Sequence, residues 1–217
     1  MVIQTMPNVN VIALKMSNQD KVILHLCADI GSDSQPYRDA GYKVICVGKD
    51  VGVENYTPPQ GVYGVIANPP CTMFSIARTT AKTPRDMRQG MEAVRHCLRI
   101  IWECMFNQYV GESSRAMPLK FWAIENPGSG YLRWYLGQPR FEYCQSEFGA
   151  PFTKRTALWG QFNTPQRPFF HPDMQRDGIG RIGMKNAIKQ RSLARGDGGG
   201  RAICPPKFAK AFFEVNP

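Results

Sequence analysis

Short apolar runs recur along the first two thirds of the chain and predict the strands of a sheet. They cover residues 21–27, 43–47, 62–67 and 121–125. Each run is almost continuously apolar, which is typical of parallel strands that are covered by helices on both faces. We therefore expect these four segments to form a buried, parallel part of a sheet.

A helix is predicted between the third and the fourth of these apolar runs. Apolar residues from Met87 to Met105 recur every three or four positions, and Thr83, Pro84 and Asp86 fit the cap, first and third positions of a helix. A shorter helix is expected over residues 37–40. The alternation of strands and helices predicts a doubly wound, mostly parallel α/β sheet, which binds ligands at the carboxyl ends of its strands.

The length of the chain, 217 residues, is that of one domain with insertions. We expect a core over residues 1–160 and a basic insertion, rich in glycine and proline, over residues 161–200. Pro205 and Pro206 are followed by apolar residues at helical spacing. This pattern predicts a C-terminal helix within residues 201–217 that returns to the core.

Composition narrows the class of protein. No stretch of about 18 apolar residues occurs, and residues 1–20 lack the basic and apolar regions of a signal peptide. Seven cysteines without a CxxC pair, together with three scattered histidines, favour free thiols over a disulfide framework or a zinc site. We expect a protein in a reducing, cytoplasmic compartment, with no membrane contact and no metal.

The charge is distributed unevenly along the chain. Residues 1–153 carry 15 Lys and Arg against 13 Asp and Glu, whereas residues 154–217 carry 12 against 4. A basic segment attached to a nearly neutral body favours a polyanionic partner, most simply nucleic acid. The alternative is a solvated basic surface without a partner.

Three loops at predicted strand ends carry candidate chemistry. Residues 68–75 read Asn-Pro-Pro-Cys-Thr-Met-Phe-Ser, and the two prolines fix an extended loop that holds Cys71 in place. This cysteine is either a nucleophile with a pKa lowered by nearby cations or a buried structural residue. Glu125 is a candidate general acid or a carboxylate that faces water. Lys154 and Arg155 begin a further predicted strand, as site cations or as ordinary edge-strand charges.

Together these loops resemble the motifs of the DNA (cytosine-5) methyltransferase family. Residues 69–75 resemble the loop that carries the family's nucleophile, and residues 125–127 resemble its glutamate turn. Residues 148–155 resemble the entry to a later strand, and residues 202–206 resemble a late double-proline motif. The four motifs occur in the family's order, and the chain is most similar to short, phage-type members that lack most of the target-recognition region.

The resemblance implies a Rossmann-like, S-adenosylmethionine-dependent methyltransferase fold with residues 1–160 as its catalytic core and with little or no target-recognition domain. It implies that the Cys71 thiolate adds to C6 of cytosine, so that C5 can attack a methyl or related one-carbon group. Glu125 would hold the base at N3 and the amino group, and Lys154 or Arg155 would steady the base or the thiolate. The target base would be flipped out of DNA.

The resemblance also implies the cofactor and the partner. S-adenosylmethionine, or a modified form of it, is expected to contact Asp29, Ile30, Gly31, Asp50, Asn68 and Pro69. A modified form stays open because only Gly31 remains of the glycines in the family's cofactor loop. DNA is expected to contact Ser75, Arg78, Lys185, Lys189 and Arg191. The last three belong to a basic strap that would bind phosphates with little sequence preference. No obligate protein partner is inferred, and a phage-encoded enzyme would act in the host cytoplasm.

Two other functions remain open from the sequence. An amino-methyltransferase that acts on adenine N6 or cytosine N4 would use the Asn68-Pro69-Pro70 loop, although such enzymes place an aromatic residue where this chain has Cys71. A non-catalytic, DNA-binding relic of the fold is the second. Within the first reading, the substrate is duplex DNA, single-stranded DNA, RNA or a nucleotide.

Overall fold

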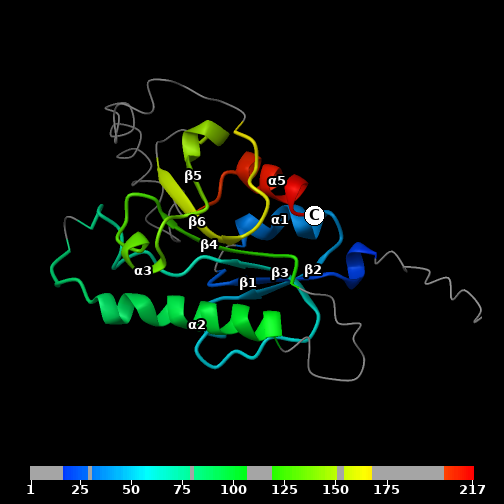
Figure 1. The fold of residues 1–217 in the computed structure, drawn as a ribbon, viewed down its shortest axis with the longest axis horizontal. Coiled ribbons are helices and arrows are strands. Elements are labelled where there is room, and N and C mark those ends of the chain that lie inside the picture. Colours follow the sequence, from blue (N-terminus) through cyan, green and yellow to red (C-terminus); the bar gives the residue numbers. More distant parts are fainter. Residues whose placement is uncertain (1–16, 29–30, 79–80, 107–118, 151–153, 168–202) are drawn as a thin grey trace, which may run out of the picture.

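A six-stranded mixed sheet forms the centre of the computed structural model, which describes residues 17–28, 31–78, 81–106, 119–150, 154–167 and 203–217 (Figure 1). The strands are β1 Val22–Leu26, β2 Lys43–Val47, β3 Val62–Ala67, β4 Phe121–Pro127, β5 Phe141–Cys144 and β6 Arg155–Gln161. Their order across the sheet is β2-β1-β3-β4-β6-β5. The pairs β2–β1, β1–β3 and β3–β4 are parallel.

The four strands expected from the apolar runs are confirmed, and the sheet differs from expectation at its other half. The strand that begins after Lys154 is β6, and it pairs antiparallel with both β4 and β5. It is therefore an interior strand, and reading its charges as those of an edge strand is wrong. The edge position on this side of the sheet belongs to β5, a strand of four residues that the sequence did not predict.

Helices cover both faces of the sheet, as the doubly wound arrangement requires. They are α1 Gln35–Asp39, α2 Met87–Phe106, α3 Arg133–Leu136 and α5 Pro206–Val215, with short 3₁₀ turns at Asn18–Asp20, Ser32–Ser34 and Gln145–Phe148. Helix α2 runs along one face, and α1 and α5 lie side by side on the other (Figure 1). Each face has its own apolar core, built on Leu24, Leu26 and Ile100 on the α2 side and on Tyr37, Phe121 and Phe208 on the other.

Helix α2 begins later than its sequence suggests. The expected cap at Thr83 is wrong, because the side-chain oxygen of Thr83 accepts a hydrogen bond from Arg78 (2.8 Å) and the helix begins at Met87. Asp86 provides the cap instead, since its carboxylate accepts a hydrogen bond from the Gln89 amide at 2.9 Å. Residues 81–86 thereby stay outside the helix and belong to the loop that follows Cys71.

The C-terminal helix closes the second core. Phe208 and Phe212 are 3% and 4% exposed and pack among the aromatic residues of this face. Beyond the helix, the Tyr37 hydroxyl donates to the Asn216 carbonyl (2.8 Å) and the Tyr63 hydroxyl donates to the Pro217 carbonyl (2.6 Å). Most of the expected basic insertion, residues 168–200, lies outside the described residues.

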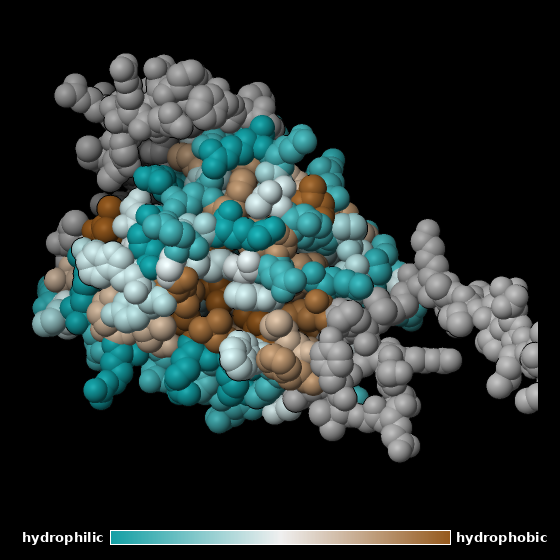
Figure 2. Space-filling model, viewed as in Figure 1, coloured by the Kyte–Doolittle hydropathy of each residue, from teal (hydrophilic) through white to brown (hydrophobic). Residues whose placement is uncertain are grey.

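The surface in Figure 2 alternates hydrophilic and hydrophobic areas, with a brown-lined hollow above α2. A cavity of about 340 Å³ lies between α2 and α3, lined by Leu98, Trp122, Ile124, Leu136 and Trp159 among others. Among the described residues, no helix has both the length and the apolar character needed to cross a membrane.

Candidate active site

A cavity at the carboxyl ends of the strands lies where the strand order reverses. From β1 the chain crosses to β2 on one side and returns to β3 on the other, so the loops after β1 and β3 diverge. Ligands of open α/β sheets bind in the crevice at such a point, beyond the carboxyl ends of the strands. The cavity here has a volume of about 780 Å³, which suits a small-molecule ligand.

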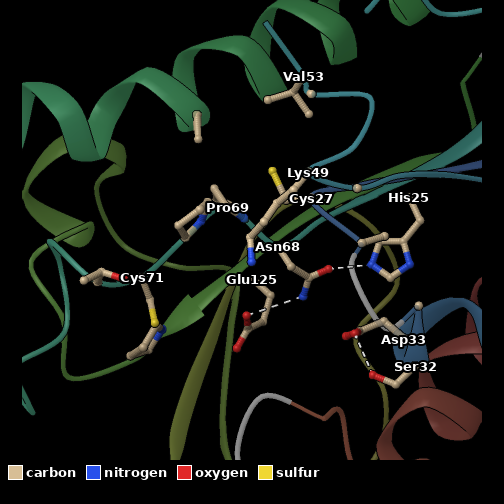
Figure 3. A pocket seen from close by; sticks show the side chains of 18 of the residues that line it. His25, Cys27, Ser32, Asp33, Lys49, Val53, Asn68, Pro69, Cys71 and Glu125 are labelled. Carbon is tan, nitrogen blue, oxygen red and sulfur yellow. Dashed lines mark hydrogen bonds between the residues drawn. The ribbon is translucent and has the colours of Figure 1, made fainter. Parts of the chain in front are cut away.

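Cys71 and Glu125 both line this cavity (Figure 3), and Lys154 lines it as well. Cys71 follows β3, Glu125 lies near the end of β4, and Lys154 directly precedes β6, which pairs with β4. The Lys154 Nζ lies 3.6 Å from the Glu125 Oε1, and both side chains are 19% exposed. The three sequence-predicted residues are thus neighbours, because parallel and antiparallel pairing places their three loops at the same edge of the sheet.

The Cys71 loop is held from two sides. Asn126, which is fully buried, donates from its side chain to the Pro69 carbonyl at 2.9 Å, and the Cys71 carbonyl accepts from the amides of Phe74 and Ser75. On the other side α2 approaches closely at Gly90, where a Cβ atom would lie 2.8 Å from Met73. The loop therefore has little room to move, and Asn126 is a positioning residue that the sequence analysis did not single out.

Electrostatics around Cys71 work in opposite directions. Burial raises the pKa of the Cys71 thiol, the charge of Lys154 lowers it, and the Glu125 carboxylate raises it again. The net shift is upward, so the cation beside Cys71 does not lower this pKa below the ordinary cysteine value. A cysteine here is mostly a thiol at neutral pH, and a reaction that uses it must remove the proton as it proceeds.

A row of polar side chains crosses the sheet beneath the cavity. The Asn68 side chain donates to Glu125 Oε2 (3.4 Å) and accepts at Oδ1 from His25 Nε2 (2.6 Å). The other ring nitrogen of His25 lies 2.8 Å from the Ser34 hydroxyl. His25 is 1% exposed in a strand of apolar residues. A histidine in such a run is the signal that could have identified it from the sequence.

Three of the six residues expected to contact a cofactor line the cavity, namely Gly31, which is in a left-handed conformation (φ 71°), Asn68 and Pro69. Asp50 is exposed and does not line the cavity, whereas Glu54 does. The Gly52 amide donates to the Gly48 carbonyl, and this turn leaves Asp50 outside. Asp29 and Ile30 lie outside the described residues.

The remaining predicted site residues lie apart from the cavity. Arg155, the first residue of β6, does not line the cavity and pairs with Glu142 at 2.9 Å. Ser75 and Arg78 belong to the loop beyond Cys71 and do not line the cavity. Lys185, Lys189 and Arg191 lie outside the described residues. In the part of the chain that the structure describes, no three His, Cys, Asp or Glu side chains are grouped so as to hold a metal ion.

The class of protein that the fold defines is an α/β protein with a ligand-sized cavity at its topological switch point. The chain matches no protein-family model and no curated protein.

Proposed function

We propose that the protein is a DNA (cytosine-5) methyltransferase-like enzyme, which adds a methyl or related one-carbon group to C5 of cytosine. The observation that carries the proposal is the meeting of Cys71, Glu125 and Lys154 at one end of a cavity of about 780 Å³. A thiol can supply the nucleophile, a carboxyl group can hold the base, and an ammonium group can offset negative charge during addition to a cytosine ring.

The chemistry gives each of these side chains a role. Cytosine C5 becomes nucleophilic when the Cys71 sulfur bonds to C6, because the addition converts the ring to an enamine. Glu125 acts as an acid toward N3, where negative charge develops, and accepts a hydrogen bond from the amino group, and Lys154 lies beside both the carboxyl group and the thiol. The thiol proton passes to water as the sulfur bonds to C6. After transfer, water takes the C5 proton and the C6–S bond breaks with its electron pair returning to sulfur, which restores the aromatic ring and the thiolate.

The far end of the cavity fits S-adenosylmethionine or a modified form of it. Two carboxylates, Asp33 and Glu54, line it and can accept hydrogen bonds from an ammonium group or from ribose hydroxyls, and Val53 and Ala28 offer an apolar wall. Bound there, the cofactor would supply an electrophilic methyl group. Asn68 lies between the two ends and contacts Glu125, so it would separate the base from the cofactor site while holding the carboxylate in place.

Nucleoside analysis of DNA from cells that express the chain tests this function. We expect 5-methyldeoxycytidine, or a deoxycytidine that carries another one-carbon group at C5, identified by mass and by retention against authentic standards. The Cys71→Ser variant, expressed to the same level, is the control and should yield none. N4-methyldeoxycytidine or N6-methyldeoxyadenine would instead identify an amino-methyltransferase, and unmodified DNA would favour a non-catalytic relic.

A further inference from the structure

A group of exposed aromatic residues lies beside the Cys71 loop and belongs to no core. Trp134 is 75% exposed and Tyr135 is 48% exposed, both on α3. The Tyr131 ring lies next to them, with its centroid 4.8 Å from that of Trp134. We call Tyr131, Trp134 and Tyr135 the aromatic platform. Large rings held in water at one place are typical of a binding surface.

The platform is built onto the Cys71 loop. The Tyr131 amide donates to the Phe74 carbonyl at 3.0 Å, and the Tyr135 ring contacts the Phe74 ring with centroids 6.3 Å apart. Gly130 permits this approach, since a Cβ atom there would lie 3.1 Å from the Phe74 oxygen. The Phe74 amide in turn donates to the Cys71 carbonyl. The platform is therefore fixed relative to Cys71 by backbone contacts only three residues away.

Positive charge accompanies the rings. Arg85 donates to the carbonyls of Met73 and Ser75, both at 2.8 Å, and its guanidinium stacks 5.0 Å from the Tyr131 ring centroid. Residues 78–88 contain four basic residues, Arg78, Lys82, Arg85 and Arg88, against Asp86. Aromatic faces interleaved with arginines are the combination by which proteins bind single-stranded nucleic acid, the rings stacking on bases and the cations following phosphates.

We propose that the aromatic platform binds unpaired bases next to the target nucleotide, so that the substrate of this protein is single-stranded DNA. Stacking needs an open base face, and a duplex hides its base faces inside the helix. A strand that lies across the platform enters the cavity at Cys71 without a base having to leave a duplex stack. The proposal rests on the proposed function only for the fate of the base in the cavity, because binding to the platform requires no reaction.

Fluorescence anisotropy with a fluorescein-labelled single strand of about 16 nucleotides, and with its duplex, tests the proposal. We expect tighter binding of the single strand, and a loss of about 5- to 150-fold in affinity for Trp134→Ala. Trp134→Phe should restore most of the affinity. Trp102→Ala is the matched control, because Trp102 is 62% exposed on α2, some 20 Å along the helix from its start. Tighter binding of the duplex, or equal losses for Trp134→Ala and Trp102→Ala, would overturn the proposal.

Photo-crosslinking of the unaltered protein gives a second measurement that does not depend on a variant. A single strand with 5-iododeoxyuridine should form adducts on the peptide of residues 128–136, and adducts confined to other peptides would contradict the platform. Crosslinks on the platform without any modified nucleoside in cells would overturn the proposed function but support binding at the aromatic platform. A modified nucleoside in cells with crosslinks only elsewhere would support the proposed function but overturn binding at the platform.

Discussion

Two cysteines of this protein, Cys71 and Cys46, have opposite surroundings. Cys71 faces the large cavity beside Glu125 and Lys154, and burial raises its pKa. Cys46 lies on the edge strand β2, does not line that cavity, and has Arg38 Nη2 only 2.7 Å from its sulfur. Interaction with the His25 side chain, and then with Arg38, lowers the pKa of Cys46 despite its burial.

The comparison shows that a low thiol pKa and access to a substrate are separate properties of a cysteine. Cys46 has the more stable thiolate, but Arg38 already contacts its sulfur and Cys46 does not line the cavity of Cys71. Cys71 has the less stable thiolate, but it stands where a ring could approach with Glu125 on the far side. A search of this fold for the cysteine of lowest pKa would therefore choose Cys46 and not the cysteine of the proposed mechanism.

The largest expected effect is on turnover. Cys71→Ser should lower the rate of methyl transfer to single-stranded DNA by about 10⁴-fold or more, because a hydroxyl is almost wholly protonated at neutral pH. Radiolabelled methyl incorporation measures the rate, and anisotropy should show unchanged DNA binding. Cys46→Ser is the matched control and should keep its turnover. Loss of activity in the Cys46 variant alone would reverse the assignment.

Cys71 should matter more than Cys46 for turnover, but Cys46 should be the more readily alkylated of the two. With iodoacetamide across a pH series, followed by peptide mass spectrometry, Cys46 should react at lower pH than Cys71, since only thiolates react. The half-reaction pH should lie below the ordinary cysteine value for Cys46 and above it for Cys71. Equal midpoints for the two peptides would show that the cavity and the Arg38 contact do not distinguish the thiols.

Removing the charge of Lys154 and removing the charge of Glu125 should shift the pKa of Cys71 in opposite directions. Neither change should shift the pKa of Cys46. Lys154→Gln removes a charge that lowers the pKa of Cys71, so its alkylation should need higher pH. Glu125→Gln removes a charge that raises this pKa, so alkylation should occur at lower pH. Arg155→Gln is the control next in sequence, and it should shift neither midpoint because Arg155 pairs with Glu142. Shifts of the same sign in the first two variants would contradict this arrangement of charges.

The smallest effect concerns how the two cysteines are held. Cys46 is fixed by a strand, whereas the loop of Cys71 depends on the side chain of Asn126. Asn126→Ala should lower the free energy of unfolding by about 1 kcal/mol, measured by urea denaturation, and speed alkylation of Cys71 alone. Asn55→Ala, at an exposed position, is the control and should change neither. Equal acceleration at Cys46 would indicate general loosening of the fold.

Four strands and the meeting of their loops could be predicted from the sequence. The apolar runs gave strand positions, and parallel pairing places loops that follow such runs at one edge, which is why Cys71 and Glu125 line one cavity. Strand β5 escaped prediction because its four residues carry too short a pattern, and they become a strand only by pairing with β6. The interior position of β6 depends on that same pairing.

Other details depended on contacts that periodicity does not contain. Helix α2 begins at Met87 rather than Pro84 because the Thr83 hydroxyl accepts a hydrogen bond from Arg78 and Asp86 caps the helix. Glu54 replaces Asp50 at the cavity because a turn closed between Gly48 and Gly52 directs the chain back. In both cases a loop conformation, set by a few hydrogen bonds, decided which side chain faced the site.

The position of α5 has a consequence for how the chain reaches its fold during synthesis. This helix, from the last 12 residues of the sequence, completes the core around Tyr37 and Phe121, which lie near the beginning and middle. While the ribosome is still adding residues, the aromatic surface of that face has no cover, and contacts so distant in sequence form slowly. We expect the nascent protein to be most prone to aggregation until residues 206–215 have left the ribosome and α5 has docked, and a chaperone that shields aromatic surface to raise its yield most in that interval.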